Sequence, residues 1–193
     1  MIMAMTRQAV FLDRDGVINR ADVKDGKSYP PALIEDLEIL PGVREAIADL
    51  HQAGFLIVVV TNQPDVATGI QSLEIVEAMH RKLREMLLID DIKVCYHAES
   101  DGCGCRKPKP GMLLEAACEH SIDLTRSYLV GDRWRDISAG KAAGCFTFFI
   151  DYGYEERSVD APDMVVHSLA EARQVILTQV PNALMEFSPT TAL

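Results

Sequence analysis

The run from Phe55 to Val60 consists of apolar and mostly β-branched residues, with no polar residue between them. A strand that is apolar at every position is typical of a parallel sheet with helices on both faces, where both sides of the strand are buried. This longest apolar run of the chain is also far shorter than the roughly 20 residues of a membrane span. We therefore expect a buried parallel strand here and no association with a membrane.

Other apolar runs alternate with helical patterns along almost the whole chain. The expected strands are Ala9–Leu12, Phe55–Val60, Ile92–Tyr96, Tyr128–Val130, Cys145–Ile150 and Met164–Val166. The expected helices are Val43–Ala53, a helix capped by Ser72 and running to about Leu88, Gly111–His120, Asp136–Ala143 and Leu169–Thr178. Such alternation predicts an α/β domain with a doubly wound, Rossmann-like parallel sheet, whose ligands bind beyond the carboxyl ends of the strands.

Length and charge narrow the possible functions. A chain of 193 residues with 48% hydrophobic residues suggests one domain spanning 1–193, with a tail at about 181–193 that we expect to be disordered. Met1–Met5 lacks the features of a signal peptide, so we expect a soluble, cytoplasmic protein. We also expect a monomer. The net charge of −10 argues against a nucleic-acid or anionic-lipid partner.

Polar residues follow three of the expected strands. Asp13-Arg14-Asp15-Gly16 comes after the first, Thr61-Asn62-Gln63 after the second and Gly131-Asp132 after the fourth, with Asp136 one helical turn later. A basic stretch, Arg106 to Gly111, lies between them. Taken alone, the first motif could be a turn, Lys107 a solvated loop charge and Thr61 a strand-end hydroxyl.

Together these groups suit phosphoryl transfer. Asp13, Asp15 and Asp132 would repel one another unless a hard cation such as Mg²⁺ lay among them. Asp13 could then attack phosphorus to form an aspartyl-phosphate, and Asp15 could act as general acid and base. Lys107 and Thr61 would stabilise the phosphoryl oxygens.

Four segments, Phe11–Asn19, Thr61–Gln63, Cys105–Met112 and Val130–Asp132, resemble the haloacid dehalogenase-like (HAD-like) phosphatases. Within this group the chain is similar to the heptose 1,7-bisphosphate phosphatases and the histidinol-phosphate phosphatases. The resemblance implies a capless HAD-like fold, Mg²⁺ as cofactor and Asp13 as nucleophile.

The resemblance also assigns the remaining site residues. It implies that Asp13, the backbone carbonyl of Asp15 and Asp132 hold the metal. Thr61, Asn62, Gln63, Arg106 and Lys107 are expected to bind the substrate.

Three cysteines and a histidine, Cys95, His97, Cys103 and Cys105, lie within eleven residues. They could form a structural Zn²⁺ site, disulfides in a secreted protein, or free thiols beside a surface histidine. Without a signal peptide, metal is favoured. The resemblance implies that these four residues are the ligands of a zinc-binding loop at about 95–105. We expect Cys118 and Cys145 to lie in the core.

Three features depart from the family pattern. The segment between His97 and Cys103 is short, Cys-Tyr-His-Ala replaces Cys-Pro-His-His, and Pro64 to Gly69 replaces Ser-Gly-Ile-Ala-Arg-Gly. The loss of that arginine and the gain of Asp65 lower the positive potential near the substrate. These differences bear on sugar specificity.

The sequence therefore predicts a Mg²⁺-dependent phosphatase of a small sugar phosphate, with a heptose bisphosphate of lipopolysaccharide or another surface glycan as first candidate. The alternative substrates are histidinol phosphate and other sugar phosphates. Two hypotheses of another class are a catalytically inactive, zinc-stabilised interaction module and a zinc-ribbon nucleic-acid binder. The intact set of acids and Lys107 disfavours the first, and the net charge disfavours the second.

Overall fold

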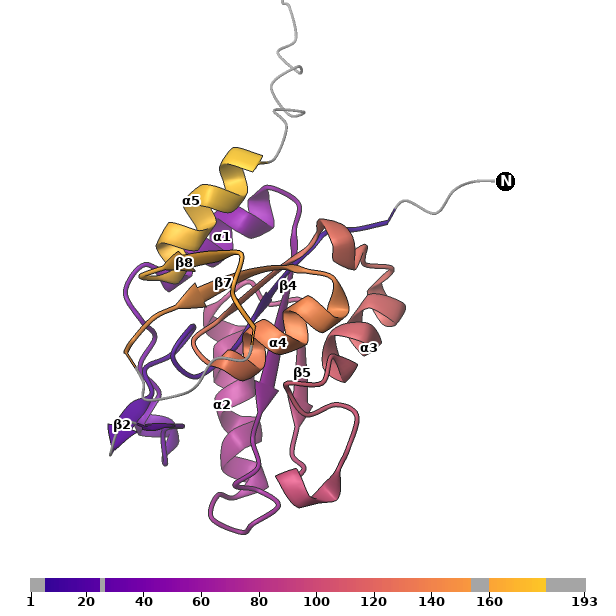
Figure 1. Ribbon diagram of the computed structural model, residues 1–193. Helices are drawn as coiled ribbons and strands as arrows, with labels where there is room; N and C mark the ends of the chain where they lie inside the picture. The colour runs from indigo at the N-terminus through magenta and orange to yellow at the C-terminus, as the bar shows by residue number, and fades with distance from the viewer. Residues whose placement is uncertain (1–5, 25–26, 154–159, 180–193) are drawn as a thin grey trace, which may run out of the picture.

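A six-stranded sheet forms the centre of the computed structural model, which describes residues 6–24, 27–153 and 160–179 (Figure 1). All paired strands in it are parallel, in the order β5-β4-β1-β6-β7-β8. The strands are β1 (Ala9–Leu12), β4 (Leu56–Asn62), β5 (Asp91–Cys95), β6 (Tyr128–Gly131), β7 (Phe146–Ile150) and β8 (Met164–Val166).

Helices cover both faces of this sheet. Residues of α1 (Val43–Gln52), α2 (Leu73–Met86) and α5 (Leu169–Gln179) share one hydrophobic core with Val10 and Leu12. Residues of α3 (Gly111–His120) and α4 (Trp134–Ala143) share the other core with Ala9 and Phe11. Successive residues of a strand point to opposite faces, so β1 contributes to both cores. The predicted doubly wound α/β fold is confirmed.

The central strands are apolar throughout because neither face meets solvent. Every residue of β1 is buried, as are Leu56 to Thr61 of β4. The second strand runs further than predicted and includes Thr61 and Asn62, which pair with Val94 and Cys95 of β5. Thr61 and Asn62 therefore belong to the end of this strand rather than to the loop that follows it.

Small elements were missed by the sequence analysis because they are too short to show a period. Strands β2 (Asp22–Lys24) and β3 (Lys27–Tyr29) form an antiparallel pair between β1 and α1. Three 3₁₀ turns, η1 (Ile34–Asp36), η2 (Glu99–Asp101) and η3 (Leu124–Arg126), lie in connecting segments. This leaves the segment between β1 and α1 with a small hairpin in place of a large cap.

One predicted helix start and one predicted capping contact need correction. α4 begins at Trp134 rather than Asp136, because the Asp136 carboxylate accepts a hydrogen bond from the Arg133 backbone N–H and closes the first turn. Ser72 precedes α2, but its hydroxyl donates to the Glu74 carboxylate instead of capping the helix.

Some expectations reach beyond the described residues. The start at Met1–Met5 and the tail at about 181–193 lie outside them, and the single domain spanning 1–193 stays a prediction. Among the described residues, no helix is both long enough and apolar enough to cross a bilayer.

Adjacent leucines in α3 test the two-layer core. Leu113 is fully buried, whereas Leu114 is 49% exposed. We expect Leu113→Ala to lower the free energy of unfolding by about 2–5 kcal/mol through lost burial and a residual cavity. Leu114→Ala should change it by less than about 0.5 kcal/mol, measured for both by urea denaturation. Equal effects would contradict this assignment of the buried face.

Candidate active site

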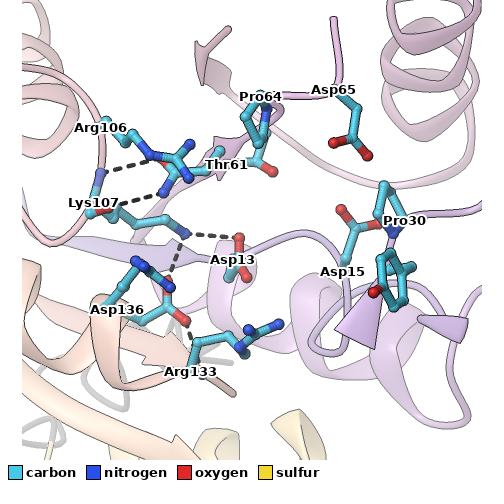
Figure 2. A pocket seen from close by; sticks show the side chains of 13 residues that line it. Asp13, Asp15, Pro30, Thr61, Pro64, Asp65, Arg106, Lys107, Arg133 and Asp136 are labelled. Carbon is cyan, nitrogen blue, oxygen red and sulfur yellow. Dashed lines mark hydrogen bonds and ion pairs between the residues drawn. The ribbon is translucent and has the colours of Figure 1, made fainter. Parts of the chain in front are cut away.

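The side chain of Lys107 lies at the centre of the charged groups beyond the sheet's carboxyl edge. Its ammonium donates to Asp13 Oδ1 at 2.8 Å and to the Val60 carbonyl at 2.7 Å, and it contacts Asp136 Oδ1 at 2.6 Å. These three contacts occupy its three N–H groups. Through Lys107, Asp13, which directly follows β1, is linked to Val60 of β4 and to Asp136 in the first turn of α4 (Figure 2).

Burial and neighbouring charges shift the ionisation of this group. Burial, partly offset by Lys107, raises the pKa of Asp13 to about 6. Burial alone would lower the pKa of Lys107, but Asp13 and Asp136 outweigh it and raise that pKa. The lysine consequently remains a cation, and it is the counter-charge for two buried acids.

Asp132, directly after β6, has no such partner. It is 1% exposed, and neither carboxylate oxygen has a hydrogen-bond partner in the part of the chain that the structure describes. Burial, followed by the charges of Asp13 and Asp136, raises its pKa well above the ordinary value. A buried, unpartnered carboxylate next to two other acids needs a proton or a cation.

Oxygen ligands from Asp13, Asp132 and Asp136 lie within 4.8 Å of one another and could hold such a cation. Gly16 lets the backbone after β1 pack closely against Asp132, because a Cβ atom at residue 16 would lie 2.1 Å from Asp132 Oδ2. Its φ of +88° is also rarely adopted by other residues. Asp136 was noted in the sequence only for its spacing from Asp132, and its contact with Lys107 shows that it belongs to the site.

Asp15 is surrounded by hydrogen-bond donors. Its carboxylate accepts from the Arg14 guanidinium, from Asn19 Nδ2 at 2.9 Å and from Gln63 Nε2 at 2.9 Å. Burial raises its pKa, but Arg14, Asn19 and Gln63 together outweigh burial and lower it. In this structure Asp15 is thus held as a carboxylate.

The three polar residues at the end of β4 have different surroundings. Thr61 lines the pocket, and its hydroxyl accepts from Gln63 Nε2. Asn62 also lines the pocket, but its amide is bonded to the backbone N–H and C=O of Lys107. Gln63 is 2% exposed, donates to Asp15 and does not line the pocket, and its expected contact with substrate stays a prediction.

A pocket of about 230 Å³ opens over these groups. Figure 2 shows Arg106 and Lys107 on one side of Asp13, Asp15, Pro30 and Asp65 on the other, and Arg133 below it. The complete lining is Asp13, Asp15, Tyr29, Pro30, Thr61, Asn62, Pro64, Asp65, Arg106, Lys107, Arg133, Arg135 and Asp136. The pocket therefore has a cationic side and an acidic side.

Sequence reasoning missed part of this lining. Arg133 and Arg135 were overlooked, although they lie one and three residues after Asp132, at the start of α4. Tyr29 and Pro30 were missed with the hairpin. Lys109, part of the basic stretch, lies outside the lining, because its ammonium donates to the carbonyls of Gly102 and Cys103.

Cys95, His97, Cys103 and Cys105 converge beside the catalytic edge. Cys105 Sγ lies 3.3 Å from Cys95 Sγ, 3.4 Å from Cys103 Sγ and 3.3 Å from His97 Nδ1. All described cysteines are free thiols, so the disulfide alternative is not formed in this structure. A tetrahedral ion with bonds of about 2.3 Å needs ligand separations of roughly 3.8 Å, close to these distances.

The two remaining cysteines differ in their surroundings. Cys145 is buried, as predicted. Cys118 is exposed on α3, and the expectation of a core position is wrong for it. The short helix turns Cys118 away from the face that packs on the sheet, where Met112, Leu113 and Ala116 lie.

Comparison with known proteins adds independent evidence. A family model described as HAD-hydrolase-like matches residues 104–172. A D-glycero-beta-D-manno-heptose-1,7-bisphosphate 7-phosphatase of Pseudomonas aeruginosa is 40% identical over 163 residues, covering 82% of this chain and 89% of the relative. A D-glycero-D-manno-heptose-1,7-bisphosphate 7-phosphatase of Thermosynechococcus vestitus is 34% identical, covering 91% and 98%.

A solved structure agrees with these relatives. The D,D-heptose 1,7-bisphosphate phosphatase of B. bronchiseptica, complexed with magnesium and phosphate, has a TM-score of 0.78 and 32% identity. The alignment covers 90% of this chain and 99% of that one. With the site geometry and the aligned length in agreement, the chain belongs to the heptose 1,7-bisphosphate phosphatase family of the HAD-like hydrolases.

Proposed function

We propose that this protein is a Mg²⁺-dependent phosphatase that hydrolyses the 7-phosphate of D-glycero-D-manno-heptose 1,7-bisphosphate. The observation that carries the proposal is the buried Asp132 carboxylate, which has no hydrogen-bond partner among the described residues and lies close to Asp13, whose ion pair with Lys107 lines the pocket. The names of the relatives support the substrate, and the magnesium and phosphate bound by the B. bronchiseptica enzyme support the cofactor.

The residues fit a hard cation. Asp13, Asp132 and the backbone carbonyl of Asp15 would hold Mg²⁺, since oxygen ligands suit this ion and the unpartnered oxygens of Asp132 need a positive neighbour. When bound, the ion neutralises negative charge between the attacking carboxylate and the phosphate. Asp136 is already bonded to Lys107 and the Arg133 N–H, and its role is to orient them.

The chain's own groups account for the two chemical steps. Before substrate binds, Asp15 is a carboxylate, and it takes up a proton when the anionic ester binds next to it. A carboxylate oxygen of Asp13 then forms a bond to phosphorus as the bond from phosphorus to the ester oxygen breaks, and Asp15 gives this proton to the leaving oxygen. Asp15 then takes a proton from water as that water attacks the aspartyl-phosphate and releases Asp13. Lys107 and the Thr61 hydroxyl stabilise charge on the transferred phosphoryl group.

The cationic side of the pocket suits a second phosphate. Arg106, Arg133 and Arg135 all line the pocket, and guanidinium groups bind phosphate oxygens in pairs. Arg135 is held above the Trp134 ring at 4.8 Å and lies 3.5 Å from Glu99 of the zinc-binding loop. We assign these arginines to the 1-phosphate of the substrate.

Asp65 favours histidinol phosphate as a second candidate. Its side chain lines the acidic side of the pocket, and its backbone carbonyl accepts from the N–H groups of Ile70 and Gln71, which fixes the loop. An acid at this position attracts an ammonium group next to the phosphate ester and repels a second phosphate.

Zn²⁺ is the second proposed metal. Cys95, His97, Cys103 and Cys105 supply four ligands at tetrahedral separations, which leaves no open position for catalytic water. Bound there, the ion crosslinks a loop that is mostly outside the hydrophobic core. Because Arg106 and Lys107 follow Cys105 directly, the role is to fix these two cations over the site. The monomeric state and the cytoplasmic location stay predictions.

The nucleophile is tested by Asp13→Asn, with Asp36→Asn, exposed in η1, as the matched control. We expect Asp13→Asn to lower kcat by at least about 10³-fold, since a carboxamide cannot form the acyl-phosphate. Phosphate release by the wild type should stop when Mg²⁺ is left out of the assay and return when Mg²⁺ is added. Release that persists in Asp13→Asn would contradict the mechanism, and a wild type inactive on every ester tried would favour the inactive module.

Substrate choice is tested by measuring kcat/KM with both anomers of heptose 1,7-bisphosphate and with histidinol phosphate. We expect the wild type to prefer a heptose bisphosphate by at least about 10-fold, equivalent to one buried charge contact. Asp65→Asn should lower kcat/KM for histidinol phosphate more than for the heptose ester. Thr68→Ala, in the same loop but outside the lining, is the control. A wild-type preference for histidinol phosphate would make it the favoured substrate, with heptose bisphosphate as the alternative.

Metal analysis tests the zinc-binding loop. We expect about one zinc per chain, and its loss in Cys103→Ser should lower the free energy of unfolding by more than about 2 kcal/mol. Cys118→Ser replaces an exposed thiol outside the cluster and should change neither zinc content nor stability. A zinc-free wild type whose melting temperature matches that of Cys103→Ser would rule this metal out.

A further inference from the structure

Arg14 stands between the two catalytic aspartates in sequence, yet its side chain is completely buried. Its Nε lies 3.1 Å and its Nη2 2.8 Å from the carboxylate oxygens of Asp15, which makes a two-pronged ion pair. Its Nη1 lies 3.1 Å from His80 Nε2, in the middle of α2. The chemistry described above uses neither Arg14 nor His80.

The contact between these side chains fixes the state of the imidazole. A guanidinium only donates hydrogen bonds, so His80 Nε2 must accept, and the ring proton lies on Nδ1. Burial, followed by the charge of Arg14, lowers the pKa of His80 to about 4, which keeps the ring neutral. Glu77 Oε1 lies 3.8 Å from Nδ1 and itself accepts from the Tyr96 hydroxyl.

A buried guanidinium that is paired with one carboxylate still has N–H groups that need an acceptor. His80 occupies Nη1, and without it this donor would point into the packed interface between α2 and the sheet. The guanidinium would then turn or draw in water, and the carboxylate paired with it would turn as well. The histidine thus limits the orientations open to the arginine.

On the basis of the proposed function, we propose that Arg14 and His80 are positioning residues, which orient Asp15 for its roles as general acid and general base. His80 holds the guanidinium, and the guanidinium orients the Asp15 carboxylate at the pocket wall, where it meets the leaving oxygen. Asn19 and Gln63 bond the same carboxylate from the other sides, and neither can replace the bidentate contact.

The chemistry of the first step separates this role from simple packing. When the bond from phosphorus to an alkyl ester oxygen breaks, the departing alkoxide must receive the proton of Asp15. A p-nitrophenolate leaves with the bonding electron pair and no proton. A badly oriented Asp15 should therefore slow the first reaction and spare the second, whereas general damage to the fold slows both.

The experiment compares His80→Leu with His80→Gln, because the glutamine side chain can place an acceptor oxygen near the position of Nε2. kcat/KM, which reports steps up to formation of the aspartyl-phosphate, is measured with glycerol 2-phosphate and with p-nitrophenyl phosphate. We expect His80→Leu to lose about 10-fold on the alkyl ester and less than about 2-fold on the aryl ester. His80→Gln should stay within about 2-fold of the wild type on both.

His51→Leu, at a surface histidine of α1, is the control for the substitution itself, and thermal melts establish that each variant is folded. Equal losses of His80→Leu on both esters, no loss on either, or failure of His80→Gln to rescue the alkyl ester would overturn the inference while leaving the phosphatase intact. Should His80→Leu fail to fold, His80→Gln and His80→Asn, compared on the two esters, decide the same question. A wild type inactive on both esters and on heptose bisphosphate would instead overturn the proposed function.

Discussion

The three contacts of the Lys107 ammonium are the interaction on which the rest of the site depends. Buried acids are costly unless a positive group compensates them, and this lysine compensates two at once, Asp13 from β1 and Asp136 from α4. Its third contact, to the Val60 carbonyl, ties the pair to the central strand. The lysine therefore links the residue after β1, a residue of β4 and the first turn of α4.

Much of the fold follows from the sequence because burial on both faces leaves a strong pattern. The continuous apolar run at Phe55 predicted a central strand, and the alternation predicted the two helical layers. The hairpin of β2 and β3 could not be found in this way, because two strands of three residues show no period. Element ends depended on single polar contacts, such as Asp136 with the Arg133 N–H, which no pattern of hydrophobicity records.

The candidate site was predictable where side chains directly follow strands, as at Asp13 and Asp132. It was not predictable where partners come from distant helices. His80 reads in the sequence as one more residue of an amphipathic helix, and only the fold places it on Arg14, 66 positions away. Gln63 shows the converse, since a residue next to the pocket in sequence points behind the catalytic carboxylate.

The position of Asp136 has a consequence for how this protein can change. The same carboxylate closes the first turn of α4 and completes the ion pair of Lys107. Local helix stability and the charge balance of the pocket are thus set by one pair of oxygen atoms. Neither property can be adjusted independently at this position, whereas a change at Asp65, which lines the pocket from a loop, alters the charge of the lining without touching the first turn of a helix.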